Sequence, residues 1–516
     1  MHADKTPAAR ASLSAAVIIV VVVLLAVIGP PVGVRAQEPR PLTTVRALES
    51  VFVDTIAGAE DAVVAISRDA GALVTRGAGG LDPLAPPIGE AVDAEREAFT
   101  PLQAGTGVLI ADPADAESCL VLTTFHVAFG DGPPDASRGL RVTARLREGS
   151  TVELRGLPYA ADRRVDLAVL RLQLDEAQVA SGDLSMMSLG EADDVRKGQF
   201  VVALGNPYAL ARDGSASASI GIVSNIGRRP QSSPTDGRSR RGESIHDYGT
   251  LLTVDLRLQL GGSGGPLLNL QGELIGMTTA LAALQGYEKS AGFAIPFDAG
   301  TRRVIGQMLR GHEAEYGFLG IAPDGARWMR PDGRTIGAVR AAHVALDSPA
   351  HQAGLRTNDL ILEINGRRVS DVGDLMRMIG LLGPGASSEL LVQRRDETET
   401  RAITARLGKW PVFDETDVLS TVPARPAWRG LSVDYPTARQ RYLSSDRLEQ
   451  YRRAVVVTHV EEGSSAAAAG VSAGDFIRAI DGVDVQTPDE FAAAGTGTAG
   501  PVELTLWDGR KVQLGS

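Results

Sequence analysis

The stretch Gly261-Gly-Ser-Gly-Gly-Pro266 places one serine, Ser263, among four glycines and directly before the apolar pair Leu267-Leu268. Glycine lets a backbone turn sharply, so several amide N–H groups can converge on one spot. Converging N–H groups are what an oxyanion hole for acyl transfer requires. The stretch therefore indicates a nucleophilic serine at the entry to a strand, with a flexible Gly-Ser turn as the alternative.

Two strings further upstream hold the residues that a serine nucleophile needs. Thr123-Thr-Phe-His126 places a histidine where an apolar strand gives way to a loop, and Val165-Asp166-Leu places a carboxylate at the start of a buried strand. A buried carboxylate is costly unless something pairs with it. The order His, Asp, Ser is that of the two-barrel serine proteases. We expect Asp166 to orient the imidazole, His126 to take the hydroxyl proton, and Ser263 to attack the scissile carbonyl.

The region from Gly105 to Pro296 is built of short apolar runs, rich in β-branched residues, that alternate with turn residues. Many short strands without alternating helices favour all-β barrels. An amphipathic helix over residues 42–59 and a first strand over residues 61–67 are expected before this region. The other expected strands lie at residues 107–110, 119–122, 140–143, 167–170, 200–204, 220–224, 251–254, 274–277 and 292–295.

The composition excludes several classes of protein. The chain has 516 residues, 44% of them apolar and 22% charged, which excludes collagen, a coiled coil or a largely disordered chain. Its length predicts several domains. Its net charge of −11 leaves no basic footprint for a nucleic-acid backbone, so no nucleic-acid partner is expected.

The single cysteine, Cys119, forbids an intramolecular disulfide and any zinc site built from several thiolates. It lies in an apolar strand, so we expect the thiol to pack in a core. The seven histidines include no His-Glu-x-x-His helix, and the chain has no Gly-Lys-Ser/Thr phosphate loop. We therefore expect no metal and no other cofactor, and we expect His246 and the four histidines after it to lie on the surface.

The N-terminus has the pattern of an export signal. Lys5 and Arg10 precede an apolar core over residues 15–28, and Val34-Arg35-Ala36 follows it. A basic start, an apolar core and a small-residue cleavage site are typical of a signal peptide. Residues 1–36 are thus expected to be a cleaved signal peptide or, if the uncharged stretch is counted from Ala11, a membrane anchor. Either reading places the functional part outside the cytoplasm, in the periplasm or cell envelope.

The C-terminal third contains an internal repeat. The pattern over residues 353–366 returns over residues 469–482, at a constant offset of 116 (470 minus 354). In each copy a short helix ends at a glycine suited to a left-handed cap, and a strand closes on Asn-Gly or Asp-Gly, a strong hairpin signal. A period this long indicates duplicated domains. Residues 409–426, with prolines at 411, 423 and 426, are expected to be a linker.

The sequence resembles the HtrA/Deg family of exported serine proteases in seven blocks that stand in the family's order. The blocks are Gly105-Thr-Gly-Val-Leu-Ile110, Leu122-Thr-Thr-Phe-His126-Val, Asp166-Leu-Ala-Val-Leu170, Leu204-Gly-Asn-Pro207, Gly221-Ile-Val-Ser224, Gly262-Ser-Gly-Gly-Pro-Leu267 and Gly292-Phe-Ala-Ile-Pro296. The resemblance implies a mostly β chain with a trypsin-like double β-barrel protease domain at 42–310. Two α+β PDZ domains, at 316–408 and 427–516, would follow it. The resemblance also implies a homo-oligomer, a trimer or a multiple of one.

The resemblance also implies which residues bind. The oxyanion donors would be the N–H groups of Gly261 and Ser263, and three residues would border a pocket for an aliphatic or small substrate side chain: Leu258, Leu260 and Thr278. The peptide-carboxylate loops would be Leu319, Gly320 and Ile321 in the first PDZ domain, and Gly430 and Leu431 in the second. The first loop is closer to the usual PDZ loop than the second, which has Arg429 beside Gly430. The first copy is therefore the better candidate for binding a C-terminal peptide.

One departure from the family's pattern lies just before the nucleophile. Where the family usually has Asn-Pro-Gly-Asn, this chain has Gln259-Leu260-Gly261-Gly262. No side chain at position 262 can hold the loop, and an extra glycine raises the entropy lost when the loop becomes ordered. The resting enzyme is therefore expected to be weakly active or to depend on substrate binding.

The leading hypothesis is an ATP-independent, extracytoplasmic serine endopeptidase that hydrolyses misfolded or specific envelope proteins. Its PDZ domains would bind substrate or activating peptides. One alternative is a PDZ peptide-binding scaffold with weak or no hydrolysis, and another is a signalling protease that cuts one membrane substrate. The expected partners are unfolded or specific polypeptides and C-terminal peptides, and an uncleaved N-terminal segment would add a membrane contact.

Overall fold

The computed structural model describes residues 40–68, 104–115, 118–174, 181–206, 215–228, 244–256, 258, 261–279, 292–395, 397–443, 449–496 and 500–515. The expected signal segment at 1–36 and the expected pocket residue Leu260 lie outside these ranges. Among the helices within these ranges, none combines the length and the apolar character needed to span a bilayer.

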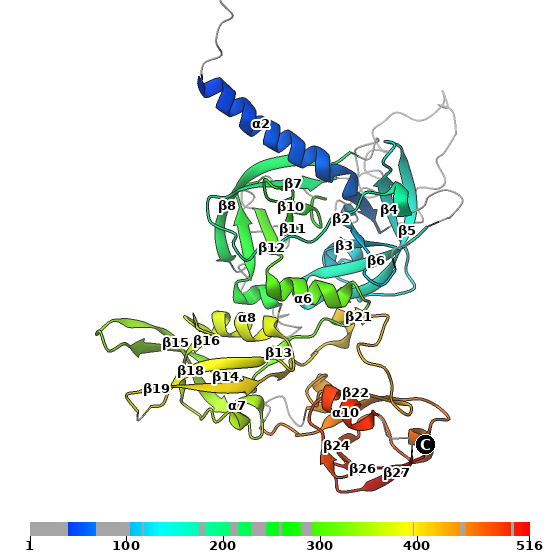
Figure 1. The fold of residues 1–516 in the computed structure, drawn as a ribbon, viewed down its shortest axis with the longest axis vertical. Helices are drawn as coiled ribbons and strands as arrows, with labels where there is room; N and C mark the ends of the chain where they lie inside the picture. The colour runs from blue at the N-terminus through cyan, green and yellow to red at the C-terminus, as the bar shows by residue number, and fades with distance from the viewer. Residues whose placement is uncertain are drawn as a thin grey trace, which may run out of the picture. The chain divides into compact units, whose positions relative to one another are not determined.

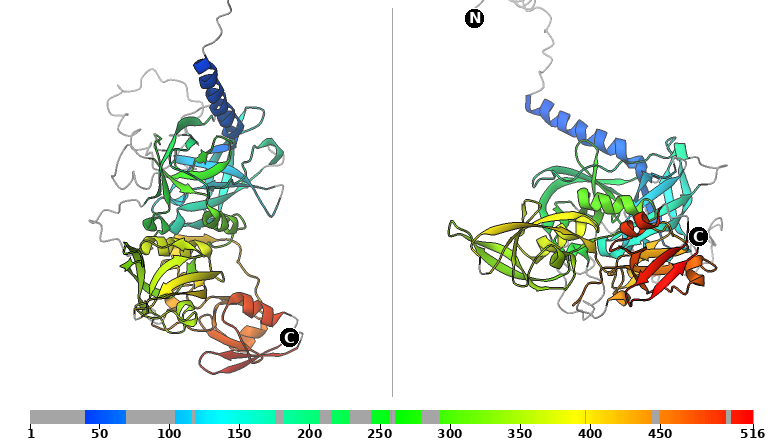
Figure 2. Two further views of the ribbon diagram at one scale, coloured as in Figure 1. Left: turned by 60° about the vertical axis from the view of Figure 1, so that its left-hand side comes forward. Right: turned by 60° about the horizontal axis from the view of Figure 1, so that its bottom comes forward.

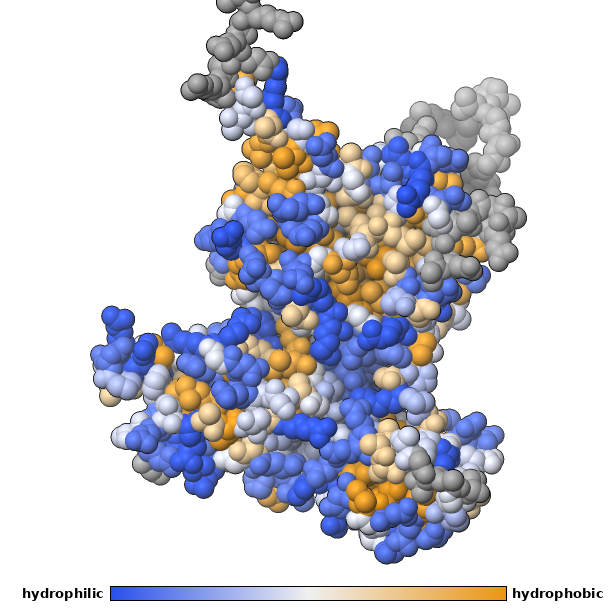
Figure 3. Space-filling view, in the orientation of Figure 1, coloured by the Kyte–Doolittle hydropathy of each residue, from blue (hydrophilic) through white to orange (hydrophobic). Residues whose placement is uncertain are grey.

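Helix α2 (Arg40–Ala59) confirms the amphipathic helix expected over residues 42–59. The chain up to Val53 forms one unit, and the chain from Asp54 onward forms another. Along α2, apolar side chains reach solvent and give the hydrophobic surface visible in Figure 3: Leu42, Val45, Leu48, Val51 and Val53.

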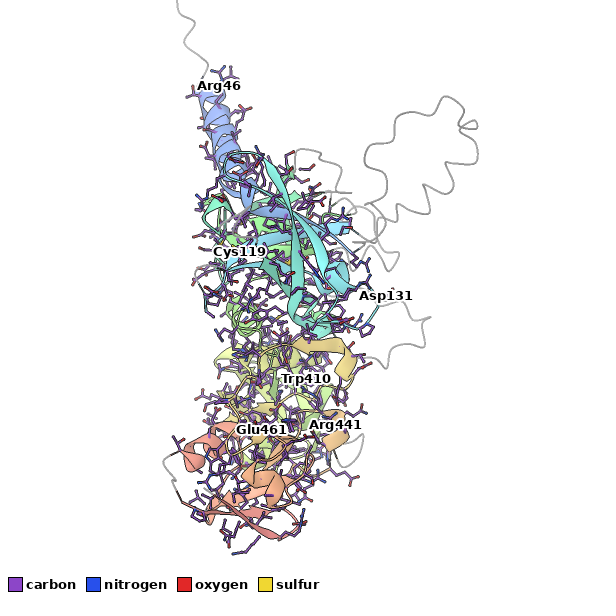
Figure 4. All side chains as sticks on the ribbon, turned by 90° about the vertical axis from the view of Figure 1, so that its right-hand side faces the viewer. Arg46, Cys119, Asp131, Trp410, Arg441 and Glu461 are labelled. Carbon is purple, nitrogen blue, oxygen red and sulfur yellow. The ribbon has the colours of Figure 1, made fainter. Side chains whose placement is uncertain are left out.

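A first barrel of six strands forms the N-terminal part of the protease region (Figure 1). Its strand order is β5-β4-β1-β2-β3-β6, and pairing of β5 with β6 closes it. The strands are β1 (Val63–Ser67), β2 (Ala104–Ala111), β3 (Cys119–Thr123), β4 (Leu140–Arg145), β5 (Thr151–Asp162) and β6 (Leu167–Gln173). Apolar side chains of β1, β2 and β3 fill the core, and Cys119 is buried among them as expected (Figure 4).

A second closed barrel has the order β10-β11-β12-β9-β8-β7, and Figure 2 shows both barrels from two further sides. Its strands are β7 (Phe200–Gly205), β8 (Ser217–Arg228), β9 (Leu251–Val254), β10 (Pro266–Leu268), β11 (Leu274–Thr279) and β12 (Gly292–Pro296). Helix α6 (Ala299–Met308) follows, with the Asp298 carboxylate accepting a hydrogen bond from the N–H of Thr301. The prediction of all-β barrels is confirmed.

Strand β5 was not among the expected strands, because its sequence mixes charged residues, glycine and proline. Its exposed positions carry the polar side chains of Thr151, Glu153 and Arg155. Its proline, Pro158, lies at a bulge where the register against β6 shifts. Proline is tolerated in a sheet at such bulges, since the ladder hydrogen bond is already interrupted there. The local sequence therefore does not reveal β5 as a strand. It forms because β4 pairs with one of its edges and β6 with the other.

The two C-terminal repeats fold alike, each around a sheet of six strands (Figure 1). The first copy contains β14 (Ile321–Met329), β15 (Thr335–Val344), β16 (Leu360–Ile364), β17 (Arg367–Arg368), β18 (Ser387–Gln393), β19 (Thr400–Arg406), α7 (Pro349–Gln352) and α8 (Val372–Leu382). The second contains β22 (Leu431–Asp434), β23 (Val455–Val460), β24 (Phe476–Ile480), β25 (Val483–Asp484), β26 (Val502–Leu506), β27 (Lys511–Leu514), α9 (Ser465–Ala468) and α10 (Pro488–Gly495).

The turn chemistry expected from the repeat is present in both copies. Asn365-Gly366 and Asp481-Gly482 all have positive φ, as a tight hairpin turn requires, and each pair joins two short antiparallel strands. Gly354 and Gly470 adopt positive φ just after α7 and α9, which are the left-handed caps that the sequence predicts.

Residues 409–426, expected as a linker, carry secondary structure that binds them to neighbouring domains. Strand β20 (Gly408–Lys409) pairs with β13 (Gly317–Phe318), and β21 (Val418–Ser420) adds to β5 of the first barrel. Thr421 also donates its hydroxyl to the carbonyl of Tyr159 at 2.8 Å. The three prolines obscured these strands, because each pairing is with residues far away in the chain.

Candidate active site

His126 and Asp166 form a close pair, in which Asp166 is buried and His126 is partly buried. Nδ1 of His126 lies 2.9 Å and 3.0 Å from the two carboxylate oxygens of Asp166. The backbone N–H of His126 donates to the same carboxylate at 3.1 Å. The Asp166 side chain is 4% exposed and that of His126 is 17% exposed, so the outer edge of the imidazole still reaches the surface.

The local backbone structure positions the side chains of His126 and Asp166. His126 lies in the single-turn helix α4 (Phe125–Phe129), which follows β3 directly. Asp166 lies between the 3-10 turn η3 (Arg163–Val165) and β6, with a left-handed backbone at φ 51°. An aspartate tolerates that conformation better than most residues. The N–H of Phe125 donates to the Asp166 carbonyl at 3.1 Å, which ties the two segments together.

Thr279 is a further partner of the pair. Its hydroxyl, on the last residue of β11, donates to the second oxygen of Asp166 at 3.0 Å, and the residue is 1% exposed. Thus the second barrel helps to hold a carboxylate that belongs to the first. The sequence analysis did not assign this role to Thr279, since its position gives no local sign of a partner 113 residues away.

Ser263 lies in the turn that leads into β10 and is 6% exposed. Gly261 and Gly264 on either side have φ of 90° and 84°. A Cβ at Gly264 would lie 2.0 Å from the carbonyl oxygen of Thr106, so no other residue fits there without moving the backbone. Gly264 is therefore required both by its positive φ and by its close approach to Thr106.

Thr278, expected at the specificity pocket, lies buried beside the nucleophile loop. The residue is 1% exposed, and its hydroxyl lies 2.7 Å from the carbonyl oxygen of Gly262 and 3.1 Å from that of Gly265. Leu258 packs half-buried against the core of the second barrel. The hydroxyl of Thr278 is thus engaged with the loop backbone.

His246 is 1% exposed, so the expectation that it lies on the surface is wrong. It belongs to the 3-10 turn η6 (Ile245–Tyr248). Its Nε2 lies 2.9 Å from the carbonyl oxygen of Val165, next to Asp166, and its Nδ1 lies near the hydroxyl of Thr250. Burial lowers the pKa of His246, which favours the neutral imidazole. The sequence around His246, Ser244-Ile245-His246-Asp247, contains no partner motif that would indicate this burial.

The first PDZ loop borders an apolar pocket of about 780 Å³. Leu319 is 4% exposed, and Gly320 has φ 82°, with Ser348 so close that a Cβ would lie 2.3 Å from it. The pocket is lined by the following residues of β14 and α8: Ile321, Ala322, Leu375, Met376 and Ile379. Trp410, Pro411 and Phe413 of the expected linker also line this pocket, which the sequence analysis did not predict.

The second PDZ loop is held differently. Gly430 has φ 82° and Leu431 is 1% exposed, so the backbone resembles that of the first loop. Arg429 beside them donates to the carbonyls of Gly500 at 2.6 Å and Gly515 at 2.5 Å. The guanidinium therefore ties this loop to the C-terminal strand region of the domain.

The arrangement suits acyl transfer by a serine. A paired carboxylate keeps the imidazole of His126 in one orientation. Ser263 lies in a glycine loop that is joined by hydrogen bonds to Thr106 of the first barrel and Thr278 of the second. Within the described ranges, no three side chains of His, Cys, Asp or Glu come together as metal ligands would.

Three stretches of the sequence match known domain families. Residues 105–277 match the trypsin-like peptidase domain, and residues 305–404 and 456–508 each match a PDZ domain.

Several curated proteins are similar to this chain over most of its length. A probable periplasmic serine endoprotease, DegP-like, of Halomonas elongata is 29% identical over 397 residues, which cover 75% of this chain and 72% of the relative. A protein of the same description from Chlamydia trachomatis is 29% identical over 392 residues, covering 75% and 68%. Among solved structures, the serine endoprotease from Yersinia pestis is 23% identical with a TM-score of 0.41, covering 69% of this chain and 97% of that one.

Proposed function

The chain is a serine endopeptidase of the HtrA/Deg type, with a trypsin-like peptidase domain and two PDZ domains, and from this premise we propose that it hydrolyses misfolded or specific envelope proteins outside the cytoplasm. The chain has no Gly-Lys-Ser/Thr phosphate loop, so we assign no ATP requirement. The periplasmic description of its relatives supports the location. We further propose that it works as a homo-oligomer, a trimer or a multiple of one.

The observation that carries the catalytic part is the buried pair of His126 and Asp166, held from the second barrel by Thr279. In the proposed mechanism, Asp166 accepts the Nδ1–H of His126 and stabilises the imidazolium that forms. Nε2 of His126 takes the proton of the Ser263 hydroxyl as the oxygen attacks the scissile carbonyl. The same Nε2 then gives the proton to the leaving amine, and water hydrolyses the acyl-enzyme in a second cycle.

We assign the stabilisation of the tetrahedral intermediate to the N–H groups of Gly261 and Ser263. Negative charge builds on the carbonyl oxygen only as the new bond forms. Fixed N–H donors aimed at that position therefore lower the energy barrier of the reaction without tightening substrate binding. Leu258, Leu260 and Thr278 remain our proposal for the borders of the specificity pocket.

The first test is Ser263→Ala in the full chain, assayed on casein. Loss of a triad member typically lowers turnover by about 10⁴ to 10⁶, and we expect a fall of that order with an unchanged melting temperature. The matched control is Ser388→Ala, which removes another buried serine, in β18 of the first PDZ domain. It should retain wild-type turnover.

Equal casein hydrolysis by Ser263→Ala and the wild type would contradict the proposal. Failure of the wild type to react with a serine-directed fluorophosphonate would instead favour the inactive scaffold. The same reagent should label the wild type and leave Ser263→Ala unlabelled.

For the PDZ region, we propose that the first loop, Leu319-Gly320-Ile321, binds the carboxylate of an apolar C-terminal peptide, with the peptide added as a strand along β14. The apolar pocket beside this loop supports the assignment. A fluorescent peptide should bind the full chain, and Gly320→Trp should abolish binding because the side chain would fill the loop next to Ser348. A peptide with a C-terminal amide that binds equally well would contradict the assignment.

A further inference from the structure

Gly262 stands between two carbonyl groups that are each anchored by a buried threonine hydroxyl. The hydroxyl of Thr106 donates to the carbonyl oxygen of Gly261 at 2.7 Å, and that of Thr278 donates to the carbonyl oxygen of Gly262 at 2.7 Å. Thr106 lies in β2 of the first barrel and Thr278 in β11 of the second. The nucleophile loop is therefore held from both barrels, at the position where no side chain is present to hold it.

The backbone N–H, the carbonyl and the hydroxyl of Thr106 all form hydrogen bonds. Its N–H donates to the carbonyl of Ser263 at 2.8 Å, and its carbonyl accepts the hydroxyl of Thr123 at 2.7 Å. Its hydroxyl oxygen also accepts the N–H of Asn206 at 3.1 Å. The residue is 0% exposed, so each of these bonds is formed out of contact with water.

Thr278 is equally engaged through its backbone. Its carbonyl accepts the N–H of Gly264 at 2.8 Å, and its N–H donates to the carbonyl of Gly265 at 2.9 Å. These two backbone bonds hold residues 264 and 265 of the loop against β11. The hydroxyl of Thr278 also donates to the carbonyl of Gly262. The carbonyl of Gly262 also accepts the N–H of Gly265 at 3.2 Å. Because a buried carbonyl that loses a donor costs free energy, these two bonds to the carbonyl favour the anchored orientation.

The anchors bear on catalysis because the carbonyl and N–H of a trans peptide point in opposite directions. The carbonyl of Gly262 shares its peptide plane with the N–H of Ser263, so the Thr278 hydroxyl sets the direction of that N–H. The carbonyl of Gly261 shares its plane with the N–H of Gly262, so the Thr106 hydroxyl fixes the preceding plane. Together they restrict both planes that flank Gly262.

We propose that Thr106 and Thr278 are positioning residues for the oxyanion loop, and that they supply the order that a side chain at position 262 would otherwise provide. This inference rests on the proposed serine-protease function. It replaces the expectation of a weakly ordered resting loop with that of a loop in which the N–H of Ser263 is already held in one orientation.

The test uses Thr106→Val and Thr278→Val in the full chain, because valine keeps the branched shape and removes only the hydroxyl. In Thr106→Val we expect kcat to fall by about tenfold to hundredfold, because a buried carbonyl that loses its donor no longer holds its peptide plane in one orientation. In Thr278→Val we expect a smaller fall, of about tenfold, because the carbonyl of Gly262 still accepts the N–H of Gly265 at 3.2 Å. KM should stay within about twofold, since oxyanion donors act mainly in the transition state. Thr106→Ser and Thr278→Ser retain the hydroxyl and should restore most of kcat.

The matched control is Thr437→Val, at a residue that is 1% exposed and donates its hydroxyl to the carbonyl of Lys409 at 2.6 Å. It loses the same kind of buried bond outside the protease region and should retain kcat. Rates are expressed per active site titrated with a fluorophosphonate, so that a partly unfolded variant still reports on the folded molecules.

Valine variants that keep wild-type kcat, serine variants no better than valine ones, or an equal loss in Thr437→Val would overturn the inference. These outcomes are distinct from failure of the proposed function. If Ser263→Ala is inactive while the valine variants keep kcat, only the positioning role is wrong. If Ser263→Ala remains active, the serine-protease function is wrong and this inference with it.

Discussion

Asp166 receives hydrogen bonds from three groups: the imidazole of His126, the backbone N–H of His126 and the hydroxyl of Thr279. The carboxylate is nearly inaccessible to water, so these donors replace its hydration and hold it in one orientation. Two of them come from the first barrel and one from the second. The geometry of a single side chain thus depends on the packing of both barrels.

At the residue scale, changing Asp166 should have a larger effect than changing Thr279, the threonine that donates to its carboxylate. Asp166→Asn should lower kcat by about 10⁴, because the amide favours the wrong tautomer of His126. Thr279→Val removes one bond of three and should lower kcat only about tenfold. Steady-state kinetics on one peptide substrate measures both, and an equal loss in the two variants would contradict this order.

The nucleophile loop is the element on which the site depends. It runs from Gly261 to Gly265, and its glycines differ in what surrounds them. Gly264 approaches the backbone of Thr106, whereas Gly272, in the turn between β10 and β11, has φ 78° with no atom within 4 Å of an added Cβ. The two positions separate the cost of positive φ from the cost of a clash.

At the element scale, Gly264→Ala should abolish casein hydrolysis and lower the free energy of unfolding by about 4 kcal/mol or more, since a Cβ would overlap the Thr106 carbonyl. Gly272→Ala should cost only about 1–2 kcal/mol, the usual cost of a left-handed backbone for a residue with a side chain. Urea unfolding and the casein assay give both quantities. Similar losses in the two variants would show that the close approach is not the deciding factor.

At the scale of the whole molecule, Lys409 joins regions that are far apart in sequence. Its Nζ lies 2.7 Å from Asp434 of the second PDZ domain and 3.1 Å from both Glu313 and Glu315, just after α6. The side chain is 2% exposed. Burial alone would lower the pKa of Lys409, but the three carboxylates outweigh it and raise the pKa. The chain therefore buries its linker lysine as a charged group.

Removing this charge should cost far more than removing an exposed one. Lys409→Met removes the cation that pairs with Asp434, while Glu313 keeps Arg439 and Glu315 keeps Arg425. Removing one partner of a buried ion pair typically costs about 3–5 kcal/mol. The control is Lys511→Met, whose ammonium lies 2.7 Å from Glu503 but is 64% exposed and should change stability little. Chemical denaturation compares them, and equal unfolding midpoints would contradict the importance of burial.

The same cluster predicts an acid dependence of stability. Burial by itself would raise the pKa of Glu313 above its ordinary value of 4.5. The charges of Lys409 and Arg439 outweigh burial and lower the pKa to about 2. A depressed carboxyl pKa stabilises the fold above the unfolded pKa and loses that effect as pH falls. The contribution of Glu313 should thus be complete above about pH 4.5 and decline toward pH 2. Glu313→Gln should flatten the stability profile in this window, and an unchanged slope would count against the prediction.

The sequence by itself determined which residues we propose for the triad, the nine strands expected over residues 107–295 and the repeat that ends on Asn365-Gly366 and Asp481-Gly482. Each of these depends on local chemistry: a turn that needs glycine, an alternation of apolar and turn residues, a hairpin that needs positive φ.

The tertiary structure alone decided what holds those pieces together. The hydroxyl of Thr106 reaches Gly261 across 155 residues, and that of Thr279 reaches Asp166 across 113. His246 is buried against the carbonyl of Val165, and Trp410 lines a pocket of the first PDZ domain although it belongs to the expected linker. Nothing in the local sequence distinguishes these side chains from ordinary surface or strand residues. Their roles arise because closing two barrels and docking the linker bring together groups whose partners only the folded chain can supply.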